Sequence, residues 1–249
     1  TIPPRALDDV LAALSPGTLA VPEVAYAAVG CGTERLEPFL QESGDIHVAL
    51  DNCPHQTVLC GPAARLGPVL DRLRGAGVFC QVLSFESGFH SPAFAEYVEP
   101  IRRVVEGLEI APPRVPVWSA TTCAPYPDDP AGVRELFLDH LVQPVRFRRL
   151  TEALYAEGVR LFVQVGAGSV AAFVEDTLRG RPHLSMAASS HRHEGIDQLR
   201  RLAATLWVEG VEVDAAVRGE PGGQAGCEPG CEQSLGGGSR RGARPRGPA

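Results

Sequence analysis

The segment at residues 88–92, G-F-H-S-P, holds the side chain best suited to acid–base chemistry in this sequence. It follows an apolar run at 78–85 and precedes an amphipathic stretch at 93–106, so His90 is predicted to lie at a strand-to-helix junction. Side chains at such junctions project from a rigid scaffold into a cleft. An imidazole in that position suits general-base work near neutral pH, because its unperturbed pKa is about 6.5.

A general base acts on a nucleophile, and the sequence lacks the usual pattern for one. The strained elbow that exposes a nucleophilic serine is written G-x-S-x-G, and none occurs in the 249 residues. Ser169 follows a glycine but does not have the flanking residues of an elbow. The chain begins with Thr1 and its only methionine is Met186, so we expect an excised or truncated piece of a longer protein.

The bulk composition is that of an ordinary globular protein. The chain has 249 residues, of which 44% are apolar and 21% are charged, which allows one large domain or two small ones. The net charge of -7 argues against a nucleic-acid partner, which would select a basic surface. No apolar run approaches the ~20 residues of a membrane span. The scattered cysteines are predicted to be buried, reduced thiols, which favours a cytoplasmic location.

Three features that resemble ligand sites are better explained without a ligand. The H-R-H sequence at 191–193 has no partner cluster, and Cys227 and Cys231 have zinc-like spacing but no second pair. Gly166 and Gly168 fall far short of a phosphate-binding fingerprint and predict a structural turn. We therefore expect neither a metal ion nor a bound cofactor.

Residues 22–88 are predicted to form a compact unit in which strands and helices alternate. The hydrophobic pattern switches repeatedly between short apolar runs and helical spacing. The resulting order, β-α-β-β-α-β, is that of the ferredoxin-like split motif. Strands are predicted at 24–29, 47–50, 57–60 and 78–85, and helices at 33–41 and 63–74.

The rest of the chain alternates helices and strands in a different style, which indicates α/β architecture. The segment at 161–165 is almost wholly apolar, which is typical of a parallel strand covered on both faces. Residues 216–249 are rich in Gly, Pro and Arg, so we predict a disordered tail there. Helices are predicted at 91–106, 132–142, 147–157, 169–179 and 194–209, and strands at 115–119, 161–165 and 184–187.

Four short motifs in this sequence match those of one known family, in the same order. They are D-N-C-P-H-Q at 51–56, F-H-S-P at 89–92, Q-P-V-R-F at 143–147 and V-G-A-G-S-V at 165–170. Together they make the chain resemble the acyl-CoA:acyl-carrier-protein transacylases, which include the acyltransferase domains of polyketide synthases. The resemblance covers roughly residues 20–212, and its first motif is most similar to iterative synthases of the enediyne and polyunsaturated fatty-acid type.

The resemblance implies a fold in which an α/β-hydrolase-like core carries an inserted ferredoxin-like subdomain, with the active site between them. On this basis the core is expected to be incomplete here, because the nucleophile elbow is missing from the sequence. The implied division is an N-terminal remnant of the core at 1–21, the subdomain at 22–88, the remainder of the core at 89–215, and a tail or linker at 216–249.

The resemblance also implies an activity. In the family, a serine attacks an acyl-CoA thioester while a histidine takes its proton, and the acyl group then passes to the phosphopantetheine thiol of an acyl carrier protein. The implied partners are malonyl-CoA, the carrier protein and upstream synthase domains. We expect this chain alone to be inactive, because the covalent step needs the missing serine. The alternative is a non-catalytic structural or docking remnant of such a synthase.

Four residues receive roles from the resemblance. His90 occupies the position of the family's catalytic histidine. Asn52 falls where an amide helps to order the site, although a turn asparagine that bonds its own backbone is the other interpretation. His140 stands where the family usually has Gln or Asn, whose backbone carbonyl orients the imidazole; its side chain is expected on the helix surface. Phe89 resembles malonyl-selective members, in which a bulky ring crowds an α-methyl branch, or it packs in the core.

The sequence departs from the family pattern in three respects. The elbow, the oxyanion-hole residues and the arginine that pairs with the malonyl carboxylate all lie upstream in the family, and that region has no counterpart here. Arg5 stands near the start, but no surrounding motif supports the carboxylate role. Gly-Ala-Gly at 166–168 replaces the usual Gly-Pro-x and is still expected to make a tight strand-to-helix turn.

Overall fold

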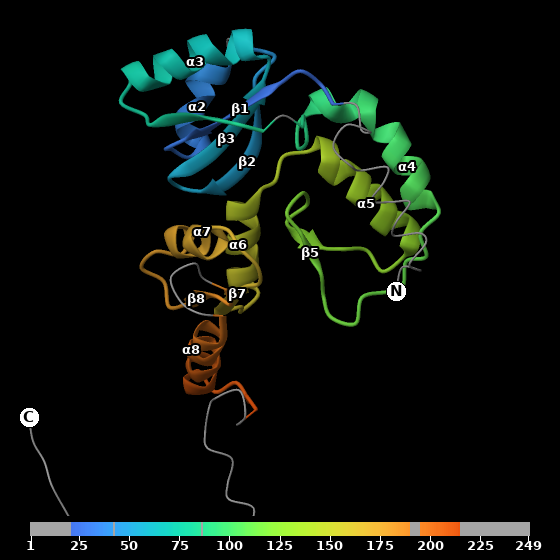
Figure 1. Ribbon diagram of the computed structural model, residues 1–249, viewed down its shortest axis with the longest axis vertical. Coiled ribbons are helices and arrows are strands. Elements are labelled where there is room, and N and C mark those ends of the chain that lie inside the picture. Colours follow the sequence, from blue (N-terminus) through green and yellow to red (C-terminus); the bar gives the residue numbers. More distant parts are fainter. Residues whose placement is uncertain (1–20, 42, 86, 190–194, 215–249) are drawn as a thin grey trace, which may run out of the picture. The chain divides into compact units, whose positions relative to one another are not determined.

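The computed structural model describes residues 21–41, 43–85, 87–189 and 195–214 (Figure 1). The predictions for residues 1–20 with Arg5, for 191–193, and for the tail at 216–249 with Cys227 and Cys231 lie outside the described residues. The chain divides into two compact units, Thr1–Glu194 and Gly195–Ala249, which are described separately below. The predicted boundary at 88/89 therefore falls inside the first unit.

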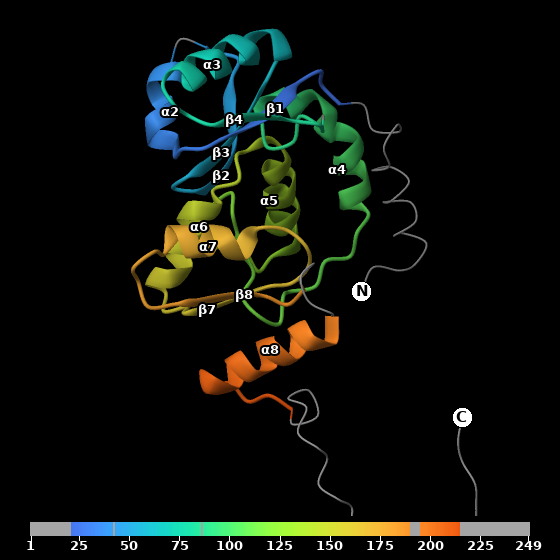
Figure 2. The same cartoon turned by 60° about the vertical axis from the view of Figure 1, so that its left-hand side comes forward.

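A four-stranded antiparallel sheet and two helices form the first part of this unit. The strands are β1 (Ala25–Val29), β2 (His47–Cys53), β3 (Gln56–Gly61) and β4 (Cys80–Leu83), in the order β2-β3-β1-β4. Helices α2 (Thr33–Leu40) and α3 (Ala63–Gly75) cover one face of the sheet (Figure 2). The observed order of elements along the chain is the β-α-β-β-α-β order predicted from the sequence.

The core of this region lies between the sheet and the two helices. Leu59 on β3 is fully buried, as are Leu36 on α2 and Leu73 on α3. Burying one such side chain stabilises the fold by about 1.5–3 kcal/mol. The other buried members of this core are Ala27, Val29, Cys31, Ile46, Leu66, Val69, Leu70 and Val78.

The β2–β3 hairpin is longer than the sequence predicted. The pattern placed a loop at 51–55, whereas the antiparallel ladder continues to the pair Cys53 and Gln56, which leaves a two-residue turn. Two irregularities in register, between Val48 and Leu50 and between Asp51 and Cys53, disturb the alternation that marks a strand in sequence. The predicted strand at 78–85 is also shorter, and β4 has four residues.

The predicted helix at 91–106 is two elements. A 3₁₀ helix, η1 (Pro92–Tyr97), is followed by α4 (Val98–Glu106). Pro100 has no N–H to donate to the carbonyl of Glu96, so one α-helical hydrogen bond is missing where the two elements meet. Pro100 is tolerated because it lies in the first turn of α4. A core of Phe94, Ile101, Val105, Leu138 and Leu141 joins η1 and α4 to α5.

Helix α5 (Pro130–Val142) packs against α4 and begins two residues earlier than predicted. Asp129 caps it, because its carboxylate accepts a hydrogen bond of 2.7 Å from the backbone N–H of Gly132. A small hairpin between α4 and α5 pairs β5 (Trp118–Ser119) with β6 (Ala124–Pro125). The sequence predicted a longer strand at 115–119 and did not predict β6.

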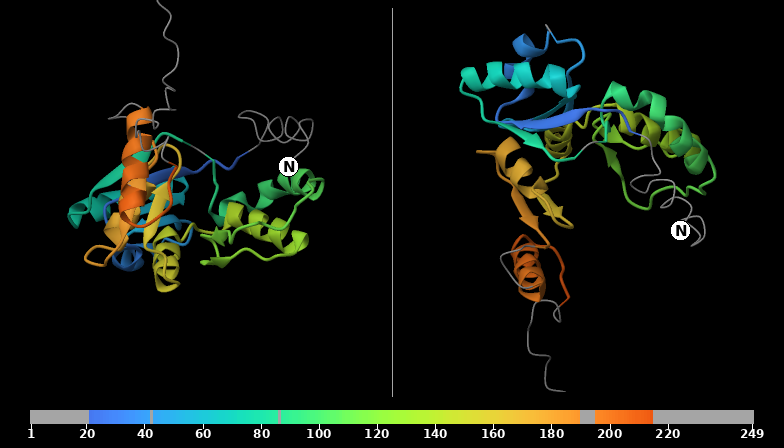
Figure 3. Two further views of the ribbon diagram at one scale, coloured as in Figure 1. Left: turned by 90° about the horizontal axis from the view of Figure 1, so that it is seen from below. Right: turned by 45° about the horizontal axis from the view of Figure 1, so that its top comes forward.

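The last part of the first unit is a parallel pair of strands, β7 (Leu161–Gln164) and β8 (Leu184–Ala187), with helices α6 (Phe147–Ala156) and α7 (Val170–Thr177) (Figure 3). Gly166 and Gly168 have φ of +103° and +131° and make the predicted turn. The side chain of Gln164 donates to both of their carbonyls and accepts from the backbone N–H of Ala171, so it fixes this turn.

The expectation that the segment 161–165 is covered on both faces was wrong. Val163 is 41% exposed and Val165 is 87% exposed. Both belong to one side of the parallel pair, which the described residues leave open. The apolar character of the segment indicated the strand correctly but not its environment.

The second unit contains α8 (Gly195–Val208). It ends in a glycine turn, because Gly210 has φ +85° and the backbone N–H of Val211 donates to the Leu206 carbonyl. Within the described residues, none of the helices combines the length and the apolar character that spanning a membrane requires.

Candidate active site

His90 lies in the short connection between β4 and η1. Its backbone φ is +62°, in the left-handed region that residues with a side chain rarely adopt. Cys123 is the one other non-glycine residue with a positive φ in the described part of the chain. Such a conformation costs about 1–2 kcal/mol and persists only where surrounding contacts hold it, which is common at functional positions.

Two carbonyl groups from the last turn of α5 hold His90 in this conformation. The backbone N–H of His90 donates to the Leu141 carbonyl at 2.7 Å. The ring Nδ1 lies 2.8 Å from the carbonyl oxygen of His140. Carbonyls in the last turn of a helix lack partners within the helix, so they are free to accept from outside it. The end of α5 therefore sets both the backbone and the ring of His90.

These contacts determine which ring nitrogen of His90 carries the hydrogen. A carbonyl oxygen can only accept, so Nδ1 donates and Nε2 keeps its lone pair in the neutral imidazole. Burial lowers the pKa of His90, and the hydrogen bond to the His140 carbonyl partly opposes that effect. The ring is therefore neutral near pH 7 with a basic Nε2, which is the state that a general base requires.

The side chain of His140 does not lie on the helix surface, as the sequence had suggested. It is half-buried, and its ring centroid is 4.8 Å from that of His90, with the two rings edge to face. Its Nδ1 lies 2.8 Å from the hydroxyl oxygen of Thr121, in the β5–β6 turn. The helical pattern could not indicate this contact, because the turn that buries His140 lies 19 residues away.

Tyr26 of β1 supports the loop that precedes His90. Its hydroxyl donates to the Phe89 carbonyl at 2.7 Å and lies 3.2 Å from the hydroxyl of Ser87. Burial raises the pKa of this phenol, so it stays protonated and keeps its donor. The pattern of an apolar strand predicts that a tyrosine within it packs in the core. Nothing in the sequence around Tyr26 indicated a role at the site.

Gly88 and Ser91 flank this loop in crowded surroundings. Gly88 has φ +74°, and a Cβ built on it would lie 2.2 Å from Cγ of Pro22. The fully buried Ser91 donates its hydroxyl hydrogen to the Gly88 carbonyl at 2.8 Å. The serine next to the catalytic candidate is thus engaged in holding the loop.

Phe89 is half-buried and packs in the small core under the loop. Its ring centroid lies 4.5 Å from that of Phe94 and 6.3 Å from that of His90. Phe89 therefore packs in the core, as one interpretation predicted, and it also lies beside the imidazole; its role in crowding an α-methyl branch stays a prediction.

Asn52 is buried in β2, and its side chain has a partner other than the histidine. Its amide nitrogen donates to the side-chain oxygen of Gln56 at 2.9 Å, across the β2–β3 turn. Among the described residues the structure brings His90, Phe89 and His140 together, and it gives Asn52 no hydrogen bond to any of the three.

The motif at 51–56 instead joins the antiparallel sheet to α6. The buried carboxylate of Asp51 lies 3.7 Å from Nε of Arg148, which also pairs with Glu34. The backbone N–H of Asp51 donates to the Val145 carbonyl, and the N–H of Val145 donates to the Ala49 carbonyl. Burial raises the pKa of Asp51, although the guanidinium of Arg148 opposes the rise.

Two further contacts complete this junction. His55, at the tip of the hairpin, places Nδ1 2.9 Å from both carboxylate oxygens of Asp176 on α7. Arg146 donates to the carbonyl of Thr121, and its own N–H donates to the carbonyl of Ala120. The motifs at 51–56 and 143–147 are therefore explained largely by how they connect the elements around the site.

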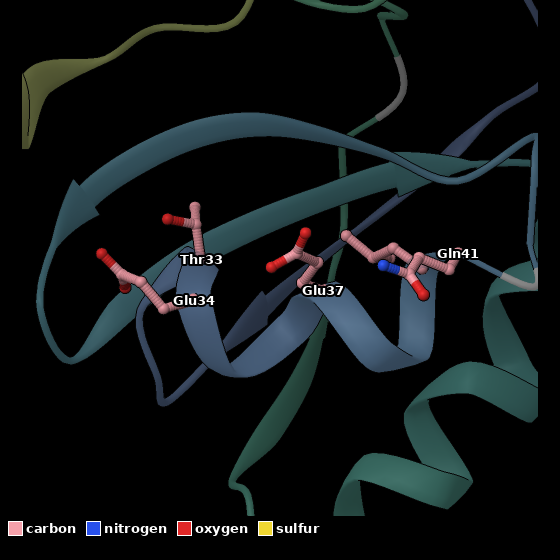
Figure 4. A pocket seen from close by; sticks show the side chains of 5 residues that line it. Thr33, Glu34, Glu37 and Gln41 are labelled. Atoms are coloured by element: carbon pink, nitrogen blue, oxygen red, sulfur yellow. The ribbon is translucent and has the colours of Figure 1, made fainter.

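Neither a metal site nor a second catalytic centre emerges from the described residues. They contain no group of three side chains able to hold a metal ion. Burial raises the pKa of every cysteine whose pKa shifts, for example to about 11 at Cys53, so these thiols are protonated near pH 7. An open depression on α2 presents the carboxylates of Glu34 and Glu37 (Figure 4), without a base–nucleophile pair.

Comparisons with known proteins agree on one family. The model of the acyl transferase domain family matches residues 18–213. The malonyl CoA-acyl carrier protein transacylase of Bacillus subtilis is 32% identical over 132 residues, which cover 52% of this chain and 41% of that protein.

Two solved structures resemble this chain in fold and sequence. The acyltransferase domain from the second module of the salinomycin polyketide synthase matches with a TM-score of 0.71 at 30% identity, over 81% of this chain and 48% of that one. The acyltransferase domain of an iterative polyketide synthase in enediyne biosynthesis matches with a TM-score of 0.66 at 26% identity, over 87% and 55%. The chain thus spans about half the length of these relatives.

Proposed function

The chain belongs to the acyl transferase domain family, and from this premise we propose that His90 serves as the general base in the transfer of an acyl group from CoA to an acyl carrier protein. The observation that carries the proposal is the hydrogen bond between Nδ1 of His90 and the His140 carbonyl, which leaves Nε2 free to accept a proton. The bonds of His90 to the Leu141 and His140 carbonyls give that nitrogen a fixed direction.

The proposed reaction has two balanced halves. A serine hydroxyl attacks the thioester carbon, its proton moves to Nε2 of His90, and the CoA thiolate leaves with that proton as the tetrahedral intermediate collapses to an acyl-serine ester. The phosphopantetheine thiol of the carrier then attacks this ester and gives its proton to Nε2. The same proton returns to the departing serine oxygen, so His90 ends neutral.

The C-terminus of α5 assists the protonated state of His90. A helix C-terminus carries a partial negative charge, and a cation beside it is stabilised by about 0.3–1 kcal/mol. The His140 carbonyl applies this charge directly at Nδ1. It thus takes the part that a buried carboxylate plays in a serine–histidine–aspartate triad, which is to orient the ring and stabilise the imidazolium as it forms.

We propose a malonyl-type acyl group as the cargo, with Phe89 as a residue that contributes to the choice. The relative from Bacillus subtilis is named for malonyl transfer, which supports this assignment. The Phe94 ring, 4.5 Å away, limits how far the Phe89 ring can move away from His90. A ring held there disfavours an additional methyl branch by about 1–3 kcal/mol. Asn52 is proposed to help order the site through its bond to Gln56.

The nucleophile is proposed to come from a segment outside this sequence, which would also complete the core around the parallel strands. Parallel sheets are normally covered on both faces and extend over several strands. The pair of β7 and β8 leaves Val163 and Val165 exposed, so we propose that it is part of a larger α/β-hydrolase-like core at 89–215. The unit at 22–88, with its strand order β2-β3-β1-β4, is proposed as the ferredoxin-like subdomain.

The 249-residue chain by itself is proposed to be inactive, and upstream synthase domains and the carrier protein are its proposed partners. The alternative function is a structural or docking remnant of a synthase, which the lack of a G-x-S-x-G serine favours. The free cysteines at 31, 53, 60, 80 and 123 suit a reducing compartment, so a cytoplasmic location is part of the proposal.

Intact-protein mass spectrometry after incubation with malonyl-CoA tests the proposal. The 249-residue chain is expected to gain no stable malonyl group. The longest reading frame that contains the chain, if it adds an elbow serine, is expected to gain one malonyl group per protein. His90→Ala in that longer protein is expected to slow acylation by about 10²–10⁴-fold. A longer protein that carries the serine and is never acylated would support the docking alternative.

A further inference from the structure

The imidazole of His140 makes contacts that its carbonyl role does not require. The carbonyl alone is enough to hold Nδ1 of His90, and any residue could supply it. The side chain nevertheless packs edge to face on the His90 ring with a centroid separation of 4.8 Å. It is held in place by the buried Thr121, whose hydroxyl oxygen lies 2.8 Å from its Nδ1.

We propose that the His140 side chain is a positioning residue that fixes the rotation of the His90 ring and discourages its protonation in the resting protein. This inference rests on the proposed function of His90. The His140 ring covers one side of the His90 ring and keeps water from it, and burial is the effect that lowers the pKa of His90. Burial also lowers the pKa of His140, and the facing His90 lowers it further, so His140 is the neutral partner when His90 takes up a proton.

Thr121 connects this pair to the motif at 143–147. Arg146 donates to the Thr121 carbonyl, and the backbone N–H of Thr121 bonds to the hydroxyl of Ser119. The turn that presents the Thr121 hydroxyl is therefore held on both sides. A chain of contacts thus runs from Arg146 through Thr121 and His140 to His90.

The other charged groups around this pair are few. On α5 itself Asp139 is the adjacent residue, and with Glu99 and Arg102 of α4 it lines a groove that does not include His140. From the β5–β6 side, Arg146 is engaged by the Thr121 carbonyl. From β1, Tyr26 stays neutral near pH 7 because burial raises its pKa. The second imidazole is therefore the main titratable neighbour of His90.

NMR titration of the ring nitrogens in ¹⁵N-histidine-labelled protein tests the proposal on the 249-residue chain as it exists. His140→Gln keeps the backbone carbonyl and removes the imidazole, and it is expected to raise the pKa of His90 while His90 keeps its hydrogen on Nδ1. Thr121→Val keeps both rings and removes the hydroxyl, and it is expected to give a smaller shift in the same direction. Asp139→Asn is the matched control on α5, with no rise expected.

Two outcomes would overturn the proposal. One is an unchanged or lower pKa of His90 in His140→Gln. The other is a rise accompanied by loss of the Nδ1–H form and of hydrogen-exchange protection at the His90 amide, because that pattern indicates that the loop has loosened. Neither outcome depends on acyl transfer, so failure of the proposed function would be seen separately, in the malonylation assay. Where the longer protein is active, His140→Gln should move the acidic limb of kcat/KM to higher pH.

Discussion

The antiparallel sheet of β1–β4 and the parallel pair of β7 and β8 cover their apolar side chains differently. In the antiparallel sheet, Leu59 and Ala27 are fully buried beneath α2 and α3. In the parallel pair, Val163 is 41% exposed and Val165 is 87% exposed. The first region buries a core on its helix-covered face within about 60 consecutive residues, although Val82 on its edge strand β4 is 56% exposed. The second leaves the side with Val163 and Val165 open within the described residues.

This difference bears on how the site is built. The loop of His90 lies where the antiparallel sheet, through Tyr26, meets α5, through Leu141 and His140. The proposed base is therefore held by the antiparallel sheet and α5. The Gly166–Gly168 turn belongs to the parallel pair. The contacts that hold His90 thus lie within the described residues, whereas the proposed reaction takes its nucleophile from another segment.

The largest expected difference in stability comes from truncating one apolar side chain in each sheet. Leu59→Ala is expected to lower the free energy of unfolding by about 3 kcal/mol, because it removes a fully buried side chain and leaves a cavity. Val163→Ala is expected to change it by less than about 0.5 kcal/mol, as at other exposed positions. Urea denaturation followed by circular dichroism measures both. Equal losses would mean that the parallel pair is as well covered as the antiparallel sheet.

A substitution at the junction of Asp51 and Arg148, between the antiparallel sheet and α6, is expected to lower stability nearly as much as one in the core. Arg148→Met removes the partner of the buried Asp51 carboxylate, one oxygen of which has no hydrogen bond within the described residues. A loss of about 2–3 kcal/mol at pH 7 is expected, because breaking a buried pair leaves an uncompensated charge. The pairing of Arg148 with Glu34 is lost as well, but Glu34 is exposed and contributes little.

The pH dependence separates this charge effect from lost packing. Burial raises the folded-state pKa of Asp51 above its unfolded value, so the folded state binds the proton more tightly. The contribution of Asp51 to stability therefore falls as pH rises through the interval between the two pKa values. In Arg148→Met the destabilisation should shrink on acidification below that interval, and Asp51→Asn added to it should restore stability at pH 7. A loss that is equal at all pH values would indicate packing alone.

Two glycines with positive φ, one in the loop of His90 and one after α6, test whether a Cβ is less well tolerated in the loop. At Gly88 a Cβ would meet Pro22 at 2.2 Å, whereas at Gly158, after α6, nothing lies within 4 Å. Gly158→Ala is expected to cost about 1 kcal/mol from backbone strain alone. Gly88→Ala is expected to cost about 2 kcal/mol, since overlap is added to strain. Gly88→Ala should also broaden the His90 ring signals in NMR spectra. Equal losses of stability in the two variants would show that Pro22 moves aside at no cost in free energy.

The sequence predicted the elements whose signals are local. Helix α3 was expected at 63–74 and is found at Ala63–Gly75, because four apolar residues recur at helical spacing and glycines follow. The turn at Gly166–Gly168 was equally well predicted, because positive φ favours glycine. The division of the predicted helix at 91–106 had no such local signal, because a proline alone does not mark a break: Pro38 and Pro68 stand inside the continuous helices α2 and α3.

The parts of the site that the sequence did not predict depend on contacts between distant segments. Tyr26 bonds to the carbonyl of a residue 63 positions away, and Thr121 meets the side chain of His140. Periodicity assigns each of these residues to a face of its own element but carries no information about the element opposite. The sequence predicted the motif at 51–56 as one segment. The buried carboxylate of Asp51 within it is explained by Arg148, which lies 97 positions further along the chain.

The smallest expected effect lies at the outer edge of the same junction, where His55 meets Asp176. Burial alone would raise the pKa of Asp176, but hydrogen bonds from His55, Cys53 and Arg179 leave it below its usual value. The His55 side chain is 71% exposed, so water and salt screen the pair and its ordering entropy offsets most of the attraction. His55→Ala is therefore expected to cost about 0.5 kcal/mol at low salt and less at 1 M NaCl, as measured by urea denaturation. A loss as large as that of Arg148→Met would show that the hairpin tip, rather than the buried Asp51, joins the antiparallel sheet to the helices of the parallel pair.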